Sequence, residues 1–153
     1  MTPSLMTPHF SYTELVTSPT ALRLGIDNTP NQAQTSNLAR LSDVLLEPAR
    51  VLLGVPMHVN SGYRSRALNA RIGGAVASAH MDGRACDFVP VGLSLRVAFE
   101  TLRTSDLPYD QIIIECNAWI HIAIAPADRQ PRREALTASG SPGHWTYEAV
   151  AHG

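Results

Sequence analysis

The chain has 153 residues, a net charge of −1 and a hydrophobic content of 44%, values that are ordinary for one globular domain. All 12 basic residues are arginine and nearly balance the acidic ones, so the sequence offers no basic face for nucleic acid. No apolar run reaches the roughly 18 residues that a membrane-spanning helix needs, so we expect no membrane partner.

The first thirty residues predict short, separate elements. We expect residues 1–10 to form a polar arm laid over the surface. Ser11 and Glu14 have the spacing of a capping box, which predicts a short helix that ends at about Val16. A turn-rich connection follows, with one helical turn predicted at 21–24.

The longest predicted helix begins at Asn31 or Thr35 and ends at about Leu53. Leucines recur at helical spacing along it and would form one apolar stripe against the core. Pro48 lies inside this stretch and lacks the backbone N–H that a helix needs, so we expect a kink or a break near Glu47.

Beyond residue 54 the predicted strands and helices alternate. Two runs separated by Asn117-Ala118 predict a tight hairpin. Residues 126–153 lose all periodicity, and a weak helix at 133–137 is the one element predicted there. Together the elements predict a single α+β domain over 1–153, with a small antiparallel sheet and helices packed on it. The predicted strands are 55–61, 85–89, 111–115 and 119–124, and the predicted helices are 66–72 and 94–103.

Two histidines and one aspartate form a candidate metal site. Asp87 follows His80 by seven residues, and His121 follows Asp87 by 34. Strand alternation turns Asp87 away from Cys86, so Asp87 and His121 can converge if their strands are neighbours. Three protein ligands with one open position are typical of catalytic zinc. The spacing alone leaves open a surface histidine at 80, buried hydrogen-bonded groups at 87 and 121, and a mononuclear iron centre.

Glu115 is the candidate general base. The predicted hairpin brings Glu115 close to His121, and a carboxylate beside an activated water can take its proton and pass it to a leaving amine. Such a set is sufficient to hydrolyse an amide. The ordinary alternatives are a solvent-exposed charge for Glu115, a surface ion pair for Arg64 and a core position for Trp119.

Several motifs occur in order along the chain. They are Ser61-Gly62-Tyr63-Arg64-Ser65, Leu68-Asn69, Ile72-Gly73-Gly74, Ser78-x-His80-x-x-Gly83-x-Ala85-x-Asp87-Phe88 and Trp119-Ile120-His121-Ile122. Together they resemble the zinc D-Ala-D-Ala carboxypeptidases and L-alanyl-D-glutamate endopeptidases, a group with the hedgehog/DD-peptidase fold that includes many phage endolysins. The opening His9-Phe10-Ser11-x-x-Glu14-Leu15 also resembles the phage-type members. The resemblance covers residues 8–125 and leaves 126–153 as a C-terminal extension.

The resemblance implies a role for each candidate residue. It assigns His80, Asp87 and His121 as ligands of one zinc ion. Arg64 corresponds to an arginine that contacts the substrate and can stabilise a developing oxyanion. Ser78 corresponds to a pocket serine that contacts the substrate. We take Trp119 as a further substrate-binding candidate.

The position of the catalytic base varies within the group that the chain resembles. Some members carry an acid three positions before the last ligand, where this chain has Ala118. Others carry a histidine two positions before it, where this chain has Trp119. The phage-type pattern places a glutamate six positions before, which corresponds to Glu115. We therefore expect Glu115 to activate the zinc-bound water.

The function that the resemblance implies is a zinc metallopeptidase that hydrolyses an amide bond in peptidoglycan stem peptides. Both an L-alanyl-D-glutamate endopeptidase and a D-Ala-D-Ala carboxypeptidase fit, and a lysis role favours the endopeptidase. The alternative is a non-catalytic, zinc-containing module of the same fold that binds cell wall or protein. A mononuclear iron oxygenase is disfavoured, because such enzymes place His-x-Asp close together. We expect a monomer with no nucleic-acid partner.

Two features bear on the cellular compartment. The first nine residues have neither the basic start nor the apolar core of a signal peptide. We therefore expect synthesis in a bacterial host's cytoplasm and, for a phage or prophage endolysin, action in the periplasm or cell wall after release by a holin. Cys86 and Cys116 are too few for a disulfide framework, and we expect both to be buried, reduced thiols.

Overall fold

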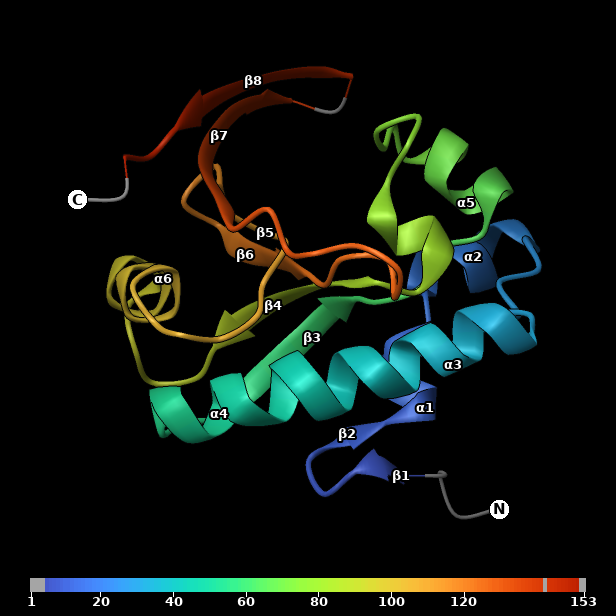
Figure 1. Cartoon of the computed structure of the whole chain (residues 1–153). Coiled ribbons are helices and arrows are strands. Elements are labelled where there is room, and N and C mark those ends of the chain that lie inside the picture. Colours follow the sequence, from blue (N-terminus) through green and yellow to red (C-terminus); the bar gives the residue numbers. More distant parts are fainter. Residues whose placement is uncertain (1–4, 142, 152–153) are drawn as a thin grey trace.

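A six-stranded sheet forms the centre of the computed structural model, which describes residues 5–141 and 143–151 (Figure 1). The strand order is β3-β4-β6-β5-β7-β8, and every neighbouring pair is antiparallel except β5 and β7. This α+β architecture confirms the predicted fold class. The strands are β3 (Met57–Ser61), β4 (Ala85–Pro90), β5 (Gln111–Glu115), β6 (Trp119–Ala123), β7 (Glu134–Ser141) and β8 (His144–Ala149).

Short helices and a separate hairpin surround this sheet. Within the described ranges, no helix is long and apolar enough to cross a membrane. The helices are α1 (Tyr12–Val16), α2 (Pro19–Leu24), α3 (Gln32–Leu41), the π-helical η1 (Ser42–Leu46), α4 (Glu47–Leu53), α5 (Arg66–Arg71), the 3₁₀ turn η2 (Ala79–Asp82) and α6 (Leu95–Arg103). The separate hairpin pairs β1 (Leu5–Thr7) with β2 (Phe10–Ser11).

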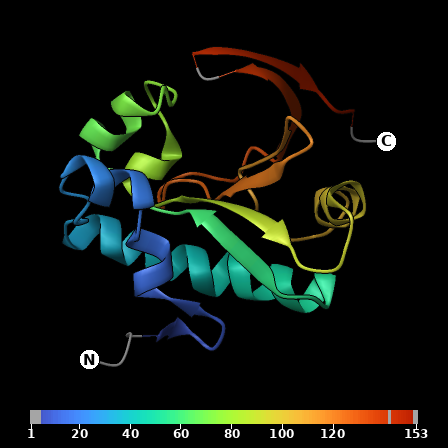
Figure 2. The same ribbon diagram turned by 180° about the vertical axis from the view of Figure 1, so that it is seen from behind.

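The hydrophobic core lies between one face of the sheet and the helices α3, α4 and α6 (Figures 1 and 2). Alternate residues of β4, β5 and β6 enter this core, and each fully buried side chain of this size contributes about 1.5–3 kcal/mol. The opposite face of the same strands is left for polar side chains. The buried residues on the core face of these strands are Cys86, Phe88, Ile112, Ile114, Ile120 and Ile122.

The long helix passes through Pro48 without breaking. The backbone N–H of Glu47 donates to the carbonyl of Ser42, five residues earlier, which marks a π-type turn. This wider turn relieves the clash that a proline ring makes with the preceding helical turn, so α4 continues directly from η1. We predicted a kink or a break near Glu47: a break is wrong, and the irregularity near Glu47 is the π-type turn of η1.

The N-terminal stretch packs against the rest of the domain more closely than the predicted surface arm would. Ser11 and Glu14 make the predicted capping box, with both reciprocal hydrogen bonds present. Phe10 is buried in the core, and the Nδ1 atom of His9 lies 2.9 Å from the carboxylate of Glu47. Residues 1–4 of the predicted arm lie outside the described residues.

The predicted hairpin between β5 and β6 is confirmed. Cys116 and Asn117 occupy the left-handed region, with φ of 50° and 53°, and the N–H of Ala118 donates to the carbonyl of Glu115 at 2.8 Å. Positive φ at both central residues is the signature of a type I′ turn. Because this turn projects from the sheet, Cys116 is exposed, which corrects our expectation of two buried thiols. Cys86 is buried, as expected, and both cysteines are free.

The C-terminal extension forms the last two strands of the sheet. β7 pairs in parallel with β5, and β8 returns antiparallel along β7. The helix predicted at 133–137 is therefore wrong. Its Glu-Ala-Leu sequence favours a helix locally, but the open edge of β5 supplies backbone hydrogen-bond partners that outweigh this preference.

Candidate metal centre and active site

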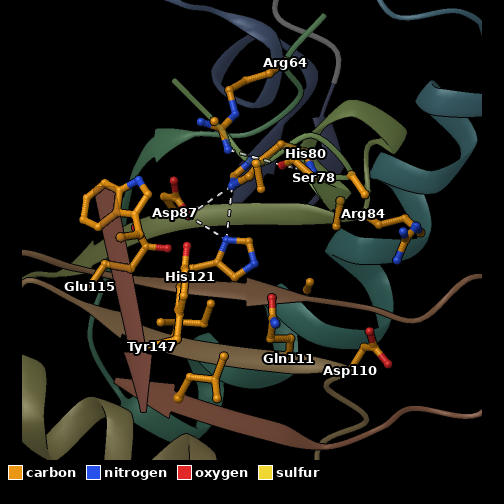
Figure 3. Close-up of a pocket in the computed structure, with 18 of the residues that line it drawn as sticks. Arg64, Ser78, His80, Arg84, Asp87, Asp110, Gln111, Glu115, His121 and Tyr147 are labelled. Atoms are coloured by element: carbon orange, nitrogen blue, oxygen red, sulfur yellow. Dashed lines mark hydrogen bonds and ion pairs between the residues drawn. The ribbon is translucent and has the colours of Figure 1, made fainter. Parts of the chain in front are cut away.

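Three side chains converge on the face of the sheet that points away from the core. Asp87 on β4 lies directly opposite His121 on β6, and His80 enters from the η2 turn (Figure 3). The Nε2 atom of His80 lies 3.1 Å from Oδ1 of Asp87 and 3.2 Å from Nδ1 of His121. The third side of this triangle, from Nδ1 of His121 to Oδ1 of Asp87, measures 3.0 Å. All three residues are buried.

The orientation of the His80 ring is fixed by the backbone behind it. Its Nδ1 atom lies 2.6 Å from the carbonyl oxygen of Gly62, an acceptor, so Nδ1 carries the proton and donates. Nε2 then presents a lone pair to the cluster, which is how protein backbones commonly orient metal-binding histidines. Only glycine fits at position 62 in this packing, because a Cβ atom there would lie 2.2 Å from the carbonyl oxygen of Leu15.

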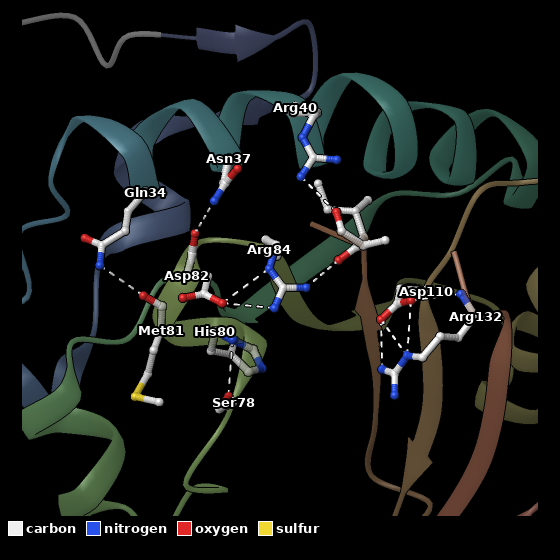
Figure 4. A network of polar contacts seen from close by, with 12 residues as sticks. Gln34, Asn37, Arg40, Ser78, His80, Met81, Asp82, Arg84, Asp110 and Arg132 are labelled. Atoms are coloured by element: carbon white, nitrogen blue, oxygen red, sulfur yellow. Dashed lines mark hydrogen bonds and ion pairs between the residues drawn. The ribbon is translucent and has the colours of Figure 1, made fainter. Parts of the chain in front are cut away.

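Helix α3 holds the loop that carries His80 (Figure 4). The side chain of Gln34 donates to the carbonyl of Met81 at 3.1 Å, and that of Asn37 donates to the carbonyl of Asp82 at 2.8 Å. The loop turns at Gly83, where φ is +75° and a Cβ atom would lie 2.4 Å from the carbonyl oxygen of Gln34. Only glycine permits this contact, so the sequence Met-Asp-Gly places His80 against the sheet.

The electrostatics of the cluster favour a cation. Burial disfavours the charged form of Asp87, but the two histidines outweigh this effect and hold the pKa of Asp87 well below its usual range. Burial lowers the pKa of His80, although Asp87 opposes this. The neutral ring and the charged carboxylate are the forms that bind a metal ion.

The donor set fits zinc. Two imidazole nitrogens and one carboxylate oxygen are its common ligands, and tetrahedral bonds of about 2.0–2.1 Å separate neighbouring ligand atoms by about 3.3 Å. The measured separations of 3.0–3.2 Å are close to this value. His80, Asp87 and His121 can therefore hold one zinc ion, as predicted.

Glu115 lies on the same face as the metal cluster. It is two residues along β5 from Ile113, which is the residue paired with His121, so strand alternation directs both side chains to one side (Figure 3). Burial raises the pKa of Glu115, and the nearby charge of Asp87 raises it further. A carboxylate with a raised pKa beside a metal cluster is suited to accept a proton and release it again.

Arg64 and Ser78 flank the cluster on the side of His80. The Nη2 atom of Arg64 lies 3.4 Å from the Ser78 hydroxyl, and its Nε atom is buried without a hydrogen-bond partner among the described residues. Burial lowers the pKa of Arg64, while Asp87 and Glu115 oppose this. A buried Nε donor without a partner is costly unless a ligand accepts from it, so Arg64 is placed to bind an oxygen of a substrate.

Trp119 lies beside Glu115 on the wall of the same cavity. The two residues are directly opposite each other on β6 and β5. The Nε1 atom of Trp119 is buried and has no hydrogen-bond partner among the residues that the structure describes. All seven of the site residues predicted from the sequence, Trp119 included, therefore line one cavity of about 640 Å³.

The contribution of the C-terminal extension to this cavity was not predicted from the sequence. Trp145 and Tyr147 on β8 and Arg129 and Arg132 before β7 all line it, as does Gln111 on β5. The alternation Trp-Thr-Tyr in 145–147 is a strand signal with an aromatic face, and it could have identified the first two. The arginines carry no comparable local pattern.

The comparisons with known proteins agree with this geometry. No curated protein matches the chain. Residues 8–123, more than half of the chain, match the family described as Peptidase M15, and the matched span includes the three metal-binding residues. The extension that forms β7 and β8 lies beyond this span. With its histidine–aspartate–histidine cluster, the chain belongs to the M15 family and is a zinc-dependent peptidase.

Proposed function

We propose that the protein is an endopeptidase that cuts peptidoglycan stem peptides at the L-alanyl-D-glutamate bond. The observation that carries the proposal is the position of Glu115, a half-buried carboxylate on the same sheet face as the metal cluster. The family supports a substrate of the peptidoglycan type.

Each residue has a distinct task in the proposed hydrolysis. Zinc held by the cluster supplies a Lewis acid that polarises the scissile carbonyl and makes water more acidic. Glu115 in its charged form accepts a proton from the attacking water and later delivers it to the leaving nitrogen. Arg64 donates hydrogen bonds to the carbonyl oxygen as negative charge develops on it. Ser78 holds the guanidinium of Arg64 in place.

The shape of the cavity favours an endopeptidase. Along β5 the cavity wall runs from Gln111 through Ile113 to Glu115, so it continues on both sides of the row that holds His121. An endopeptidase needs room for the peptide on both sides of the cut bond. The second candidate, a D-Ala-D-Ala carboxypeptidase, needs to hold one residue on the far side.

The experiment is a digest of purified peptidoglycan, analysed by mass spectrometry, with and without a chelator and with zinc added back. We expect fragments that begin with D-glutamate, that disappear with chelator and that return with zinc. Release of free D-alanine instead would establish the carboxypeptidase. Intact peptidoglycan from folded, zinc-loaded protein would rule out both.

We also propose that the protein works as a phage or prophage endolysin in the periplasm or cell wall. The support for this is the location of the proposed substrate. Expression in a Gram-negative host tests it: cells should lyse when the inner membrane is permeabilised by a holin and should grow normally without one. Lysis that does not depend on holin would contradict the proposed route of release.

A further inference from the structure

The C-terminal hairpin presents two aromatic side chains to the active-site cavity. Trp145 and Tyr147 alternate along β8 and both line the cavity, and Tyr147 keeps 46% of its surface exposed. Figure 3 shows Tyr147 projecting toward the cavity on the side of Glu115. The β7 residues opposite them are small, Gly140 facing Trp145 and Ala138 facing Tyr147. These small neighbours leave the faces of the two rings uncovered.

The two ends of the cavity differ in chemistry. Trp145 and Tyr147 stand with Glu115 at one end. Gln111, Arg129 and the ion pair of Arg132 with Asp110 line the other. Gln111 and Glu115 are four residues apart on one strand, which corresponds to about 13 Å. The row of His121 and Ile113 lies midway between them. A bound chain that runs along β5 therefore meets flat aromatic rings on one side of the metal and guanidinium groups on the other.

The substrate of the proposed function has the same asymmetry. On the C-terminal side of the L-alanyl-D-glutamate bond, the stem peptide carries carboxylates, which suit arginine. On the N-terminal side it carries one alanine and then the amino sugar of the glycan strand. The sugar ring is the one group near the bond with a broad apolar face, and indole and phenol rings offer a matching face with a polar edge.

We propose that Trp145 and Tyr147 form a subsite for the amino sugar to which the stem peptide is attached. The proposal rests on the function proposed above. One alanine and one lactyl ether separate the bond from the sugar, a span of about 7 Å. Along the strand direction, the row of Tyr147 is displaced from the row of His121 by two residues, which is also about 7 Å. Across the sheet, β8 is separated from β6 by β5 and β7, and the side chains of Tyr147 and His121 meet the same cavity across these two strands. β7 and β8 curve away from β5 and β6, and the end of their hairpin lies on the side of α5 (Figures 1 and 2).

The consequence is a preference for peptide that is still joined to glycan. Binding is measured by calorimetry on zinc-loaded E115Q protein, which cannot turn the ligand over if Glu115 is the base. The two ligands are a disaccharide-tetrapeptide prepared from peptidoglycan and the same tetrapeptide without sugar. We expect the glycan-linked ligand to bind about tenfold more tightly. Adding W145A or Y147A to this background should remove most of the difference and leave the affinity for free tetrapeptide unchanged.

The matched control is T146A, because Thr146 lies between the two aromatic residues on β8 and does not line the cavity. It should keep the full preference for the glycan-linked ligand. Two variants are used so that a folding defect in one leaves the other informative, and zinc content and thermal unfolding check both.

The outcomes separate the subsite from the proposed function. Equal affinity for the two ligands in the parent protein, or an equal loss for both in W145A and Y147A, would overturn the subsite. If wild-type protein cuts neither ligand but prefers the sugar-linked one, the subsite stands and the proposed function fails. If wild-type protein cuts both ligands at equal rates and binds both equally, the proposed function stands and the subsite fails.

Discussion

The family-matched part of the chain and its C-terminal extension share one cavity but differ in what they bring to it. The matched part, residues 8–123, supplies the metal ligands, which are buried, and Glu115, which is half-buried. The extension supplies a half-exposed aromatic wall on a two-stranded hairpin and arginines in the segment before that hairpin. The chemistry is thus built into the rigid centre of the sheet, whereas the surface that meets the rest of the substrate is added at its edge.

The difference teaches how the two parts tolerate change. A shift of 1 Å in His80 would destroy the ligand triangle, so Gly62, Gly83 and helix α3 fix its position from behind. The positions of Trp145 and Tyr147 need not be as exact, because an aromatic ring can stack on a ligand over a range of positions. Substitutions in the matched part should therefore act on turnover and metal content, and those in the extension should act on affinity and local stability.

Loss of a metal ligand should have the largest effect. We expect D87A and H121A to lose bound zinc and to fall to background activity, because two ligands hold zinc far more weakly than three. Elemental analysis of purified protein and the peptidoglycan digest measure the two effects. The control is H58A, since His58 is an exposed histidine on β3 of the same sheet. Full zinc content in D87A would contradict the assigned ligand set.

Removal of the proposed base should come next. We expect E115Q to retain zinc and to lose about 10²–10⁴-fold in kcat, the usual contribution of a positioned acid–base group. The matched control is E148Q, an exposed glutamate on β8 of the extension, which should keep wild-type activity. Unchanged turnover in E115Q with zinc bound would assign the base to another group.

Replacement of Gly83, which follows His80 in the same loop, should show how tightly this loop packs against α3. We expect G83A to lower the free energy of unfolding by about 2–4 kcal/mol, because it combines left-handed strain with a clash against α3. Denaturant unfolding of zinc-loaded protein measures this value. G92A is the control, since Gly92 has φ of +82° and no atom within 4 Å of its Cβ position, so it carries the strain without the clash. Equal losses in the two variants would show that the close contact with α3 does not matter.

The smallest of these effects should come from the ion pair that anchors the extension. Asp110 accepts hydrogen bonds from the backbone N–H of Arg132 at 2.9 Å and from its guanidinium at 2.8 Å (Figure 4). Burial raises the pKa of Asp110, but these bonds outweigh it and the net pKa is lowered. We expect D110N to destabilise the protein by about 1–3 kcal/mol at neutral pH.

The pH dependence of this anchor has a definite sign. A carboxyl group whose pKa is lowered by folding adds stability above its unfolded pKa of about 3.9 and loses it as pH falls through the folded pKa. The stability difference between wild type and D110N should therefore shrink as pH falls below about 4. Thermal unfolding at a series of pH values tests this. A stability difference between wild type and D110N that stays constant across the range would show that the charge of Asp110 does not cause it.

Much of the site follows from local sequence patterns. The alternation around Asp87 and His121 fixes which face each side chain takes, and the short hairpin sets the distance of Glu115 from His121. The depth of burial of Arg64 does not follow from its motif, because it depends on how the loop of Ser78 packs over the sheet. The spacing of the three ligands along the chain suggests a cluster, but only the folded structure brings their ligand atoms within about 3 Å of one another.

The extension shows where such patterns fail. β7 joins β5 in parallel, and this pairing links residues 23 positions apart, with β6 and an irregular loop between them. No local periodicity encodes such a contact, and the Glu-Ala-Leu run at 134–136 favours a helix by itself. Cys116 was expected to be buried because of its residue type, whereas the type I′ turn that it occupies must project into solvent.

The parallel pairing of β7 with β5 has a consequence for solubility. β5 contains three consecutive isoleucines, and without β7 its backbone N–H and C=O groups would form an open, apolar edge. Such edges recruit strands from other chains and lead to aggregation. β7 covers this edge, and the new outermost strand, β8, carries the charged Glu148 and the polar Thr146 instead. The hairpin that lines the cavity thus also protects the sheet against self-association.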